Sequence, residues 1–403
     1  MDACSPRLLL IRAAALLGGC LLGHGATAGA WSGNVALEWL AFPESSLSEE
    51  QHRSYLSLSF EPEYQLEWDG GRKSFTFEAF ARGSQFDSRR SHVDIREFNI
   101  GIVERDWELT AGISKVYWGI TESQHLVDIV NQTDLVENLD TEDKLGQPMI
   151  NLALVRNAGT LNLFVLPGFR ERTFAGAAGR PRFGLEVDQD NEIYESSAGR
   201  RHVDLAARWF QYLGEWEIGL SYFRGTSRTP DLVVTPTGPT TAPVLTPVYD
   251  QIDQAGLEVQ GAFGAWLWKL EAIRNAGFAN RHYAAATGGF EYTYVLESGV
   301  EVGALMEYSW DDRGRDAPSQ FQNDMLFGIR ITPNDVQSTQ ILAGVLVDLD
   351  GGGHSYNVEA ERRIGDSLKL SLEARGIFHT APEDFLYSLR RDDYVRLNLA
   401  WYF

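Results

Sequence analysis

Two segments of the 403-residue chain concentrate charged side chains in a way that could select ions or dipolar solutes. Residues 121–146 read TESQHLVDIVNQTDLVENLDTEDKLG, where carboxylates outnumber the single lysine. Residues 167–182 read PGFRERTFAGAAGRPR and carry four arginines. Charged groups held close to a passing solute select it by short-range electrostatics. The candidates for such a role are Asp128, Asp134, Glu137, Asp140, Arg170, Arg172, Arg180 and Arg182.

The sequence lacks the motifs of common hydrolytic and metal chemistry. Neither GxSxG nor HExxH occurs, and the eight histidines are scattered. The run DLDGGGH at 348–354 has the acidic, glycine-rich character of a calcium loop, but it lacks the remaining ligands and the distal glutamate. A tight surface turn is the better interpretation. We therefore predict a protein that is not an enzyme, with no catalytic residue, metal or cofactor.

Strict two-residue alternation of apolar and polar side chains runs through most of the chain. SFTFEAFAR at 74–82, WLWKLEA at 266–272 and YVRLNLAWYF at 394–403 are examples. This period predicts strands with unlike faces, and no long stretch has helical periodicity. The predicted strands lie near 33–42, 53–67, 73–82, 93–104, 107–117, 147–156, 159–167, 201–212, 215–225, 250–262, 265–275, 283–296, 299–310, 322–332, 338–348, 354–364, 367–378 and 392–403.

The connections between these strands alternate in length. Every second connection is a short turn, whereas 118–146, 168–200 and 226–249 are long, and the last of these is rich in Pro and Thr and reads as irregular. Short turns at one end and long loops at the other are typical of an outer-membrane barrel. We predict an all-β fold, a transmembrane antiparallel barrel of about 18 strands, with 16 as the alternative. A soluble sandwich or propeller explains the Trp and Tyr near strand ends less well.

In such a barrel the polar faces line a lumen that side chains cannot fill. The lumen-lining candidates carry both signs of charge: Arg208, Lys269, Glu271, Glu291, Arg330 and Arg375, together with Glu78, Arg96, Glu108, Glu258, Glu301, Glu307, Glu359, Arg363, Glu373 and Arg396. Pairing across neighbouring strands, which would only stiffen the wall, is the alternative for each of them.

The acidic segment 121–146 also contains many apolar residues. Because a surface loop has little reason to be so apolar, we expect it to fold into the barrel and narrow the pore. An extracellular cap, with a short helix, is the alternative. The arginines of 167–182 could face the carboxylates across the channel, bind anionic lipopolysaccharide at the rim, or pair with Glu171 and Glu186.

Residues 1–28 have the features of a secretory signal peptide. Arg7 and Arg12 precede an uncharged apolar stretch, residues 13–23, which is followed by a small-residue cleavage site, Ala26-Thr27-Ala28. Cleavage there would remove both cysteines and leave residues 29–403 as a single barrel domain. The net charge of −21 argues against nucleic acid as a partner.

With these features the chain resembles a Gram-negative outer-membrane porin. Its end is similar to the C-terminal insertion signal of barrel proteins, carried here by Tyr394, Leu399, Trp401 and Phe403. Residues 94–119 and 128–137 are also similar to a segment of uncharacterised proteobacterial outer-membrane proteins. The resemblance implies an outer-membrane location, contact with lipid and lipopolysaccharide, and recognition of the last strand by the barrel-assembly machinery. It identifies neither the solute nor the oligomeric state.

The function expected from these features is passive diffusion of small hydrophilic solutes across the outer membrane. An export channel for an anionic polysaccharide is the first alternative, and it would need a basic lumen. A surface receptor or adhesin with a plugged lumen is the second.

Overall fold

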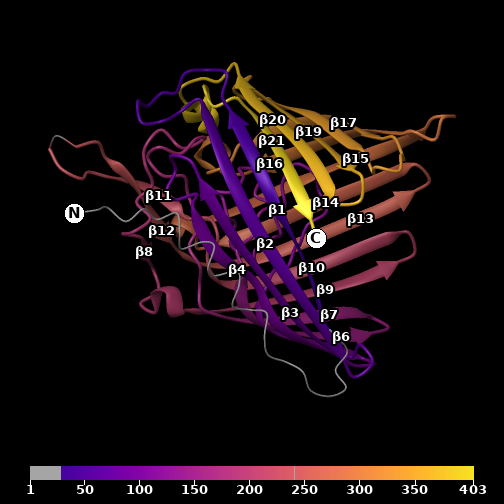
Figure 1. Cartoon of the computed structure of the whole chain (residues 1–403). Coiled ribbons are helices and arrows are strands. Elements are labelled where there is room, and N and C mark those ends of the chain that lie inside the picture. The colour runs from indigo at the N-terminus through magenta and orange to yellow at the C-terminus, as the bar shows by residue number, and fades with distance from the viewer. Residues whose placement is uncertain (1–28, 240) are drawn as a thin grey trace, which may run out of the picture.

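The computed structural model describes residues 29–239 and 241–403, so the expected signal peptide lies outside the described residues. Eighteen strands form one antiparallel sheet that closes on itself (Figure 1). They are β1 (Ala30–Ala41), β2 (Ser54–Trp68), β3 (Lys73–Ser84), β4 (His92–Val103), β5 (Trp107–Ser114), β6 (Gln147–Arg156), β7 (Gly159–Pro167), β9 (Val203–Leu213), β10 (Trp216–Thr226), β13 (Gln251–Phe263), β14 (Trp266–Ala276), β15 (His282–Val295), β16 (Glu301–Asp311), β17 (Asn323–Thr332), β18 (Gln340–Asp348), β19 (His354–Ile364), β20 (Leu368–Phe378) and β21 (Tyr394–Tyr402).

The barrel closes where the first strand pairs with the last. The pairing of β1 with β21 runs from Asn34 opposite Tyr402 to Ala41 opposite Val395. The backbone N–H of Phe403 then donates to the carbonyl of Gly33 at 3.1 Å. Because the sheet has no open edge, its backbone groups are paired within the wall, as a strand structure in lipid requires. The predicted strand number of 18 is confirmed, and each predicted strand lies within a few residues of an observed one.

The outer and inner faces of the wall differ as the alternation predicts. Along β21 and the chain end, Trp401 and Phe403 point outward and are 49% and 46% exposed, whereas Tyr394 points inward and is 3% exposed. Trp266 and Trp268 of β14 are likewise on the outside, with Glu271 of the same strand buried inside. A closed sheet with an apolar outer band is a transmembrane barrel.

The long connections contain structure that the sequence did not reveal. The segment 226–249, which we predicted to be irregular, holds β11 (Asp231–Thr235) and β12 (Val244–Tyr249), and these form a three-stranded sheet with β8 (Ile193–Tyr194). The hairpin of β11 and β12 projects from the long-loop end of the barrel (Figure 1). Pro247 is tolerated because β12 pairs with β8 only at Val248 and Tyr249.

The helices of the described chain are short 3-10 turns: η2 (Gly199–Arg201), η3 (Phe278–Asn280), η4 (Gly314–Asp316) and η5 (Phe385–Leu389). None of the helices in the described part of the chain is long and apolar enough to cross a membrane. The connection between β5 and β6 contains no helix, so the short helix considered for that segment is not formed.

Gly289 of β15 offers a test of how tightly the wall is packed. A Cβ at this position would lie 1.9 Å from the backbone oxygen of Met306 in β16, so Gly289→Ala must displace backbone. We expect a loss of about 1–3 kcal/mol in the free energy of unfolding, measured by urea titration in detergent micelles. Gly83→Ala in β3 is the matched control, since nothing lies within 4 Å of its Cβ position. Equal stability of the two variants would contradict this packing.

Candidate functional site

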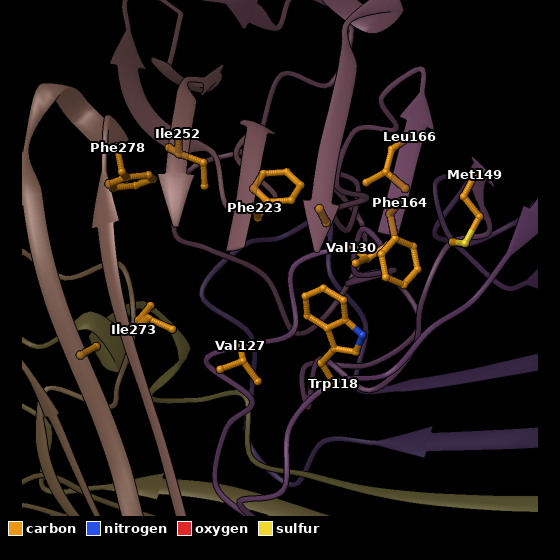
Figure 2. Packing of buried hydrophobic residues seen from close by; sticks show 12 residues of the cluster. Trp118, Val127, Val130, Met149, Phe164, Leu166, Phe223, Ile252, Ile273 and Phe278 are labelled. Atoms are coloured by element: carbon orange, nitrogen blue, oxygen red, sulfur yellow. The ribbon is translucent and has the colours of Figure 1, made fainter. Parts of the chain in front are cut away.

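The connection between β5 and β6, residues 115–146, lies inside the barrel, and we call it the inner loop. Its residues Trp118, Val127 and Val130 are buried in one cluster with Phe164 of β7 and Phe223 of β10 (Figure 2). The cluster continues along the wall to Met149, Leu166, Ala206, Ile252, Ile273, Phe278 and Ala285. Full burial of each such side chain contributes about 1.5–3 kcal/mol. The apolar content of the segment is therefore explained by packing on the inner wall.

Two carboxylates of the wall hold the first half of the inner loop. Glu271 of β14, which is 0% exposed, accepts the N–H of Ile120 at 2.6 Å and the N–H and O–H of Thr121 at 2.9 and 2.8 Å. Glu307 of β16 accepts the N–H and O–H of Ser123, both at 2.8 Å. Hydrogen bonds to an ionised acceptor are stronger than neutral ones. Glu271, which we predicted to line the lumen, is instead an anchor for the loop.

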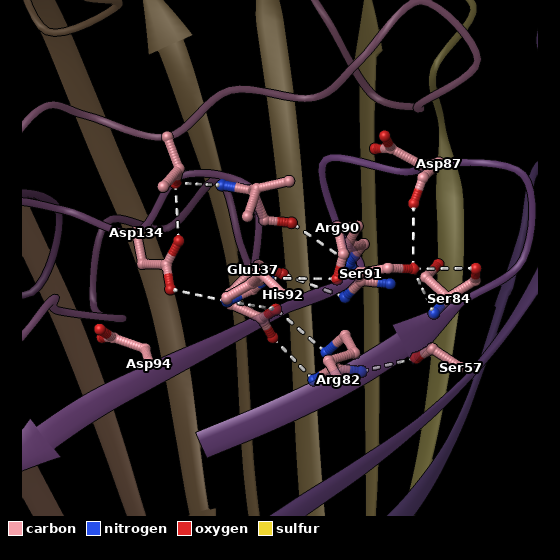
Figure 3. Close-up of polar contacts among 12 residues, drawn as sticks. Ser57, Arg82, Ser84, Asp87, Arg90, Ser91, His92, Asp94, Asp134 and Glu137 are labelled. Atoms are coloured by element: carbon pink, nitrogen blue, oxygen red, sulfur yellow. Dashed lines mark hydrogen bonds and ion pairs between the residues drawn. The ribbon is translucent and has the colours of Figure 1, made fainter. Parts of the chain in front are cut away.

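Ion pairs hold the second half of the inner loop against the opposite side of the wall. Asp134 accepts from Arg96 of β4 at 2.6 Å, and Glu137 accepts from Arg82 of β3 at 2.7 Å. Figure 3 shows Glu137 directed at Arg82, and Asp134 directed at His92 of β4. Although burial raises the pKa of Asp134, hydrogen bonding by His92 and the charge of Arg96 outweigh it and lower that pKa to about 2. The carboxyl is therefore ionised throughout the physiological range.

The ion pairs continue onto the strands that close the barrel. Arg90, in the connection between β3 and β4, donates to Glu38 of β1 at 3.1 Å. Arg396 of β21 lies 3.8 Å from Glu38 and 3.4 Å from Glu373 of β20. Arg396 also donates to the backbone oxygen of Glu137 at 3.1 Å. First strand, last strand and inner loop thus share one charge network.

Asp128 and Asp134 do not face open space. Asp128 is buried within the inner loop and pairs with Lys144 at 3.1 Å, and it lines neither of the two cavities described below. Asp134 lines neither cavity either, because Arg96 and Thr173 enclose it. The expectation that these two carboxylates face the pore is therefore corrected.

The arginine-rich segment lies beside the inner loop rather than across a channel from it. Thr173 accepts the N–H of Val136 at 3.1 Å and donates to Asp134 at 2.6 Å. The two segments leave neighbouring strand pairs at the same end of the barrel, so they emerge side by side. The predicted transverse pair of loops is therefore corrected: the bases that meet Asp134 and Glu137 come from the wall.

The four arginines of this segment have different surroundings. Arg170 pairs with Asp94 of β4 at 2.8 Å, and Arg180 pairs with Asp392 at 2.6 Å. Arg172 is held by two long, uncharged contacts, to Gln132 at 3.3 Å and Thr229 at 3.4 Å. Arg182 donates to the backbone oxygen of Phe183 at 3.3 Å. Neither Glu171 nor Glu186 pairs with any of the four arginines in the described structure; Glu171 pairs with Arg200 instead.

Two cavities lie on either side of the inner loop. One, of about 540 Å³, opens toward the long loops, and the other, of about 530 Å³, lies toward the short turns. Four residues line both: Glu122 and Asp140 of the inner loop, Leu342 of β18 and Glu359 of β19. The cavities therefore adjoin where the inner loop faces these two strands, and we call this place the junction.

The junction is lined by carboxylates and by the arginines that pair with them. Arg330 of β17 lies 2.7 Å from Glu122, and Arg375 of β20 lies 3.0 Å from Glu359 and 3.7 Å from Asp140. Burial raises the pKa of Asp140 to about 6, with Arg375 acting against that rise. A solute passing from one cavity to the other meets charges of both signs, with carboxylates in excess.

Three other predicted lumen residues, Arg208, Glu291 and Lys269, lie on the inner wall beside partners of opposite charge. Arg208 holds Glu258 at 2.7 Å, Glu291 contacts Arg330 at 3.3 Å, and Lys269 lies 3.9 Å from Glu122. Sequence reasoning missed Arg82 and Arg90 as partners of the inner loop. Arg82 lies on the polar face of its strand with Glu78, and this pattern could have placed it on the inner wall. Arg90 lies in a connection between strands, where no alternation indicates the direction of its side chain.

The closed sheet, its apolar outer band and the inward loop together decide the class. The protein is a porin-like transmembrane β-barrel. No protein-family model matches the chain, and no curated protein matches it.

Solved structures similar to the barrel include porins, at low identity. One is a mutant of Rh. blastica porin, with 10% identity and a TM-score of 0.46 over 93% of this chain and 100% of the other. A triple mutant of Rhodopseudomonas blastica porin has the same identity and coverage and a TM-score of 0.45. Similarity at this level indicates neither a solute nor an activity. The fold is assigned from the strand pairing itself.

Glu271 offers a test of the loop anchor. Glu271→Ala leaves the N–H groups of Ile120 and Thr121 without their acceptor, and unsatisfied buried donors cost about 1–3 kcal/mol each. We expect tryptic cleavage after Lys144, which is buried in the intact barrel, to become at least about tenfold faster. Glu361→Ala is the control, since its carboxylate pairs only with the partly exposed Lys369. Unchanged cleavage in the Glu271 variant would contradict the anchoring role.

Proposed function

We propose that this barrel is an outer-membrane channel for passive diffusion of small hydrophilic solutes, with its short turns in the periplasm. The observation that supports the proposal most directly is the junction, where cavities of about 540 and 530 Å³ adjoin inside a closed wall beside charged side chains. A wall of 18 strands leaves a lumen that side chains alone do not fill. The inner loop then sets the width and charge of the passage.

The channel prefers cations in this proposal. The carboxylates that line the cavity toward the short turns are Glu38, Glu61, Glu122, Glu137, Asp140, Asp143, Glu359, Glu361 and Glu373, and the bases are Arg82, Arg96, Lys115, Lys144, Arg330 and Arg396. Carboxylates are in excess, and a surplus of one sign in a confined space raises the local concentration of the opposite ion. The same excess speaks against export of an anionic polysaccharide, which needs a basic lumen.

A receptor or adhesin with a plugged lumen is the second candidate. The inner loop inside the barrel and the sheet of β8, β11 and β12 at the long-loop end favour it. Single-channel recording of the purified protein in planar bilayers separates the two functions. A large conductance that stays open supports the channel, and a membrane that remains sealed despite folded, inserted protein supports the receptor.

We further propose that residues 1–28 direct export and that the last strand is the insertion signal. Leu399, Trp401 and Phe403 present apolar side chains on the outside of the wall, where the barrel-assembly machinery and lipid would meet them. Tyr394, the fourth residue of the proposed signal, lies on the inner face and donates to Glu373 at 2.6 Å in the closed barrel. Contact of the rim with lipopolysaccharide stays part of this proposal.

Asp140 offers a test of selectivity at the junction. Asp140→Asn removes one negative charge from the passage, and we expect the cation-to-anion permeability ratio to fall roughly twofold. The reversal potential across a bilayer with a KCl gradient measures this ratio. Asp106→Asn, in a short turn outside both cavities, is the control. An unchanged ratio in the Asp140 variant would count against the junction as the selective element.

The pH dependence of selectivity follows from the same carboxyl. Because burial raises the pKa of Asp140 to about 6, its charge is present above pH 6 and is lost as the pH falls through that value. We expect the cation preference to decrease between about pH 7 and pH 5 with a midpoint near 6. Reversal potentials measured over this range should show a clearly smaller step in Asp140→Asn than in the wild type. A residual step is expected because burial also raises the pKa of Asp143, which lines the same cavity, to about 7. A step of equal size in both would assign the titration to another group.

A further inference from the structure

The cavity toward the long loops, which we call the vestibule, has an unusual lining for a passage of hydrophilic solutes. Much of its wall is made of Phe174, Leu185, Val187, Leu232, Leu326 and Leu389, which come from the arginine-rich segment and its continuation, β11, β17 and η5. Its volume of about 540 Å³ is within the range of cavities that enclose small organic ligands. Such sites combine an apolar lining with a few polar groups that fix the orientation of the ligand.

The carboxylates that line the vestibule already have partners. Glu122 pairs with Arg330, Glu359 with Arg375, and Glu142 with His125 at 3.1 Å. The remaining two pair with bases as well: Asp140 with Arg375 and Asp392 with Arg180. Each carboxylate that lines the vestibule therefore lies beside a base of the protein.

Two arginines that line the vestibule form no ion pair through their guanidiniums in the described part of the chain. Over residues 29–239 and 241–403, the guanidiniums of Arg172 and Arg182 form no ion pair with a carboxylate within 4.0 Å. The backbone N–H of Arg182 donates to Asp392 at 3.4 Å. The Nε of Arg182 is buried and has no acceptor among the described residues. The contacts of Arg172, at 3.3 and 3.4 Å, are to an amide oxygen and a hydroxyl. Both arginines are partly exposed, and a guanidinium that has no ion-pair partner, with one buried donor unsatisfied, is complementary to an added carboxylate.

We propose that the vestibule binds an amphipathic organic monocarboxylate. The carboxylate would accept from the guanidiniums of Arg172 and Arg182, for which planar donors are well suited. The apolar body would displace water from the surface formed by Phe174, Leu185 and Leu389. The proposed feature is a binding site in the vestibule, and the binding does not require that the barrel conducts.

Equilibrium binding to the full barrel in lipid nanodiscs tests this site. Isothermal titration with 3-phenylpropanoate should give saturable binding, whereas the neutral 3-phenylpropan-1-ol and the small anion acetate should each bind at least about tenfold more weakly, because each lacks one of the two contacts. The double variant Arg172→Gln with Arg182→Gln should lose at least about tenfold in affinity for 3-phenylpropanoate.

The matched control is Arg200→Gln, in the same long connection but exposed and paired with Glu171 and Glu192. It should bind 3-phenylpropanoate as the wild type does. Equal affinity of the double variant and the wild type, or equal affinity of acetate and 3-phenylpropanoate for the wild type, would overturn the inference. If the double variant does not fold, the comparison of the three probes on the wild type decides.

The outcome is separable from that of the proposed function. Saturable, arginine-dependent binding in a barrel without conductance would support the proposed binding site and overturn the proposed channel function. Conductance without such binding would support the channel and overturn the proposed binding site.

Discussion

The arrangement of the interior depends on the hydrogen bonds that Glu271 makes to the backbone of the inner loop. A carboxylate excluded from water is unfavourable unless several donors surround it, and here the N–H groups of Ile120 and Thr121 and a hydroxyl supply them. The same contacts give the loop's polar backbone the partners that a buried segment needs. The wall carboxylate and the loop backbone therefore satisfy each other's hydrogen-bonding groups. Both cavities take their shape from the position of the inner loop.

The strand pattern was predictable from the sequence because it is a local property. Each strand carries its own alternation, so 18 strands and their faces could be read without knowing which strand pairs with which. The closure of β1 on β21 followed from the apolar chain end at Phe403. The β11–β12 hairpin was not predicted because its Pro and Thr content is typical of irregular loops. The pairing of β12 with β8 joins segments far apart in the sequence, so local patterns do not reveal it.

The interior was predictable only in part, for a physical reason. The apolar residues of the inner loop signalled that it is buried, and Val127 and Val130 carry that packing. Which charged side chains pair depends on their distances in the folded protein, which the sequence does not give. Asp128 was predicted to face the pore, but it pairs with Lys144 of the same loop. The arginines were predicted to oppose the carboxylates because the charges are complementary, but Thr173 and Asp134 show that the two segments touch.

The charge network at the barrel seam bears on the order in which the structure can form. Glu38 belongs to the first strand and Arg396 to the last, and they approach each other only when the wall is closed. Arg396 also holds the backbone oxygen of Glu137, so the far half of the inner loop acquires its full set of partners at the same moment. Ring closure and loop docking are thus coupled steps of assembly. A barrel still open at its seam would lack the contacts that Arg396 makes with Glu38 and Glu137, so the inner loop would be held only by its contacts with the other strands.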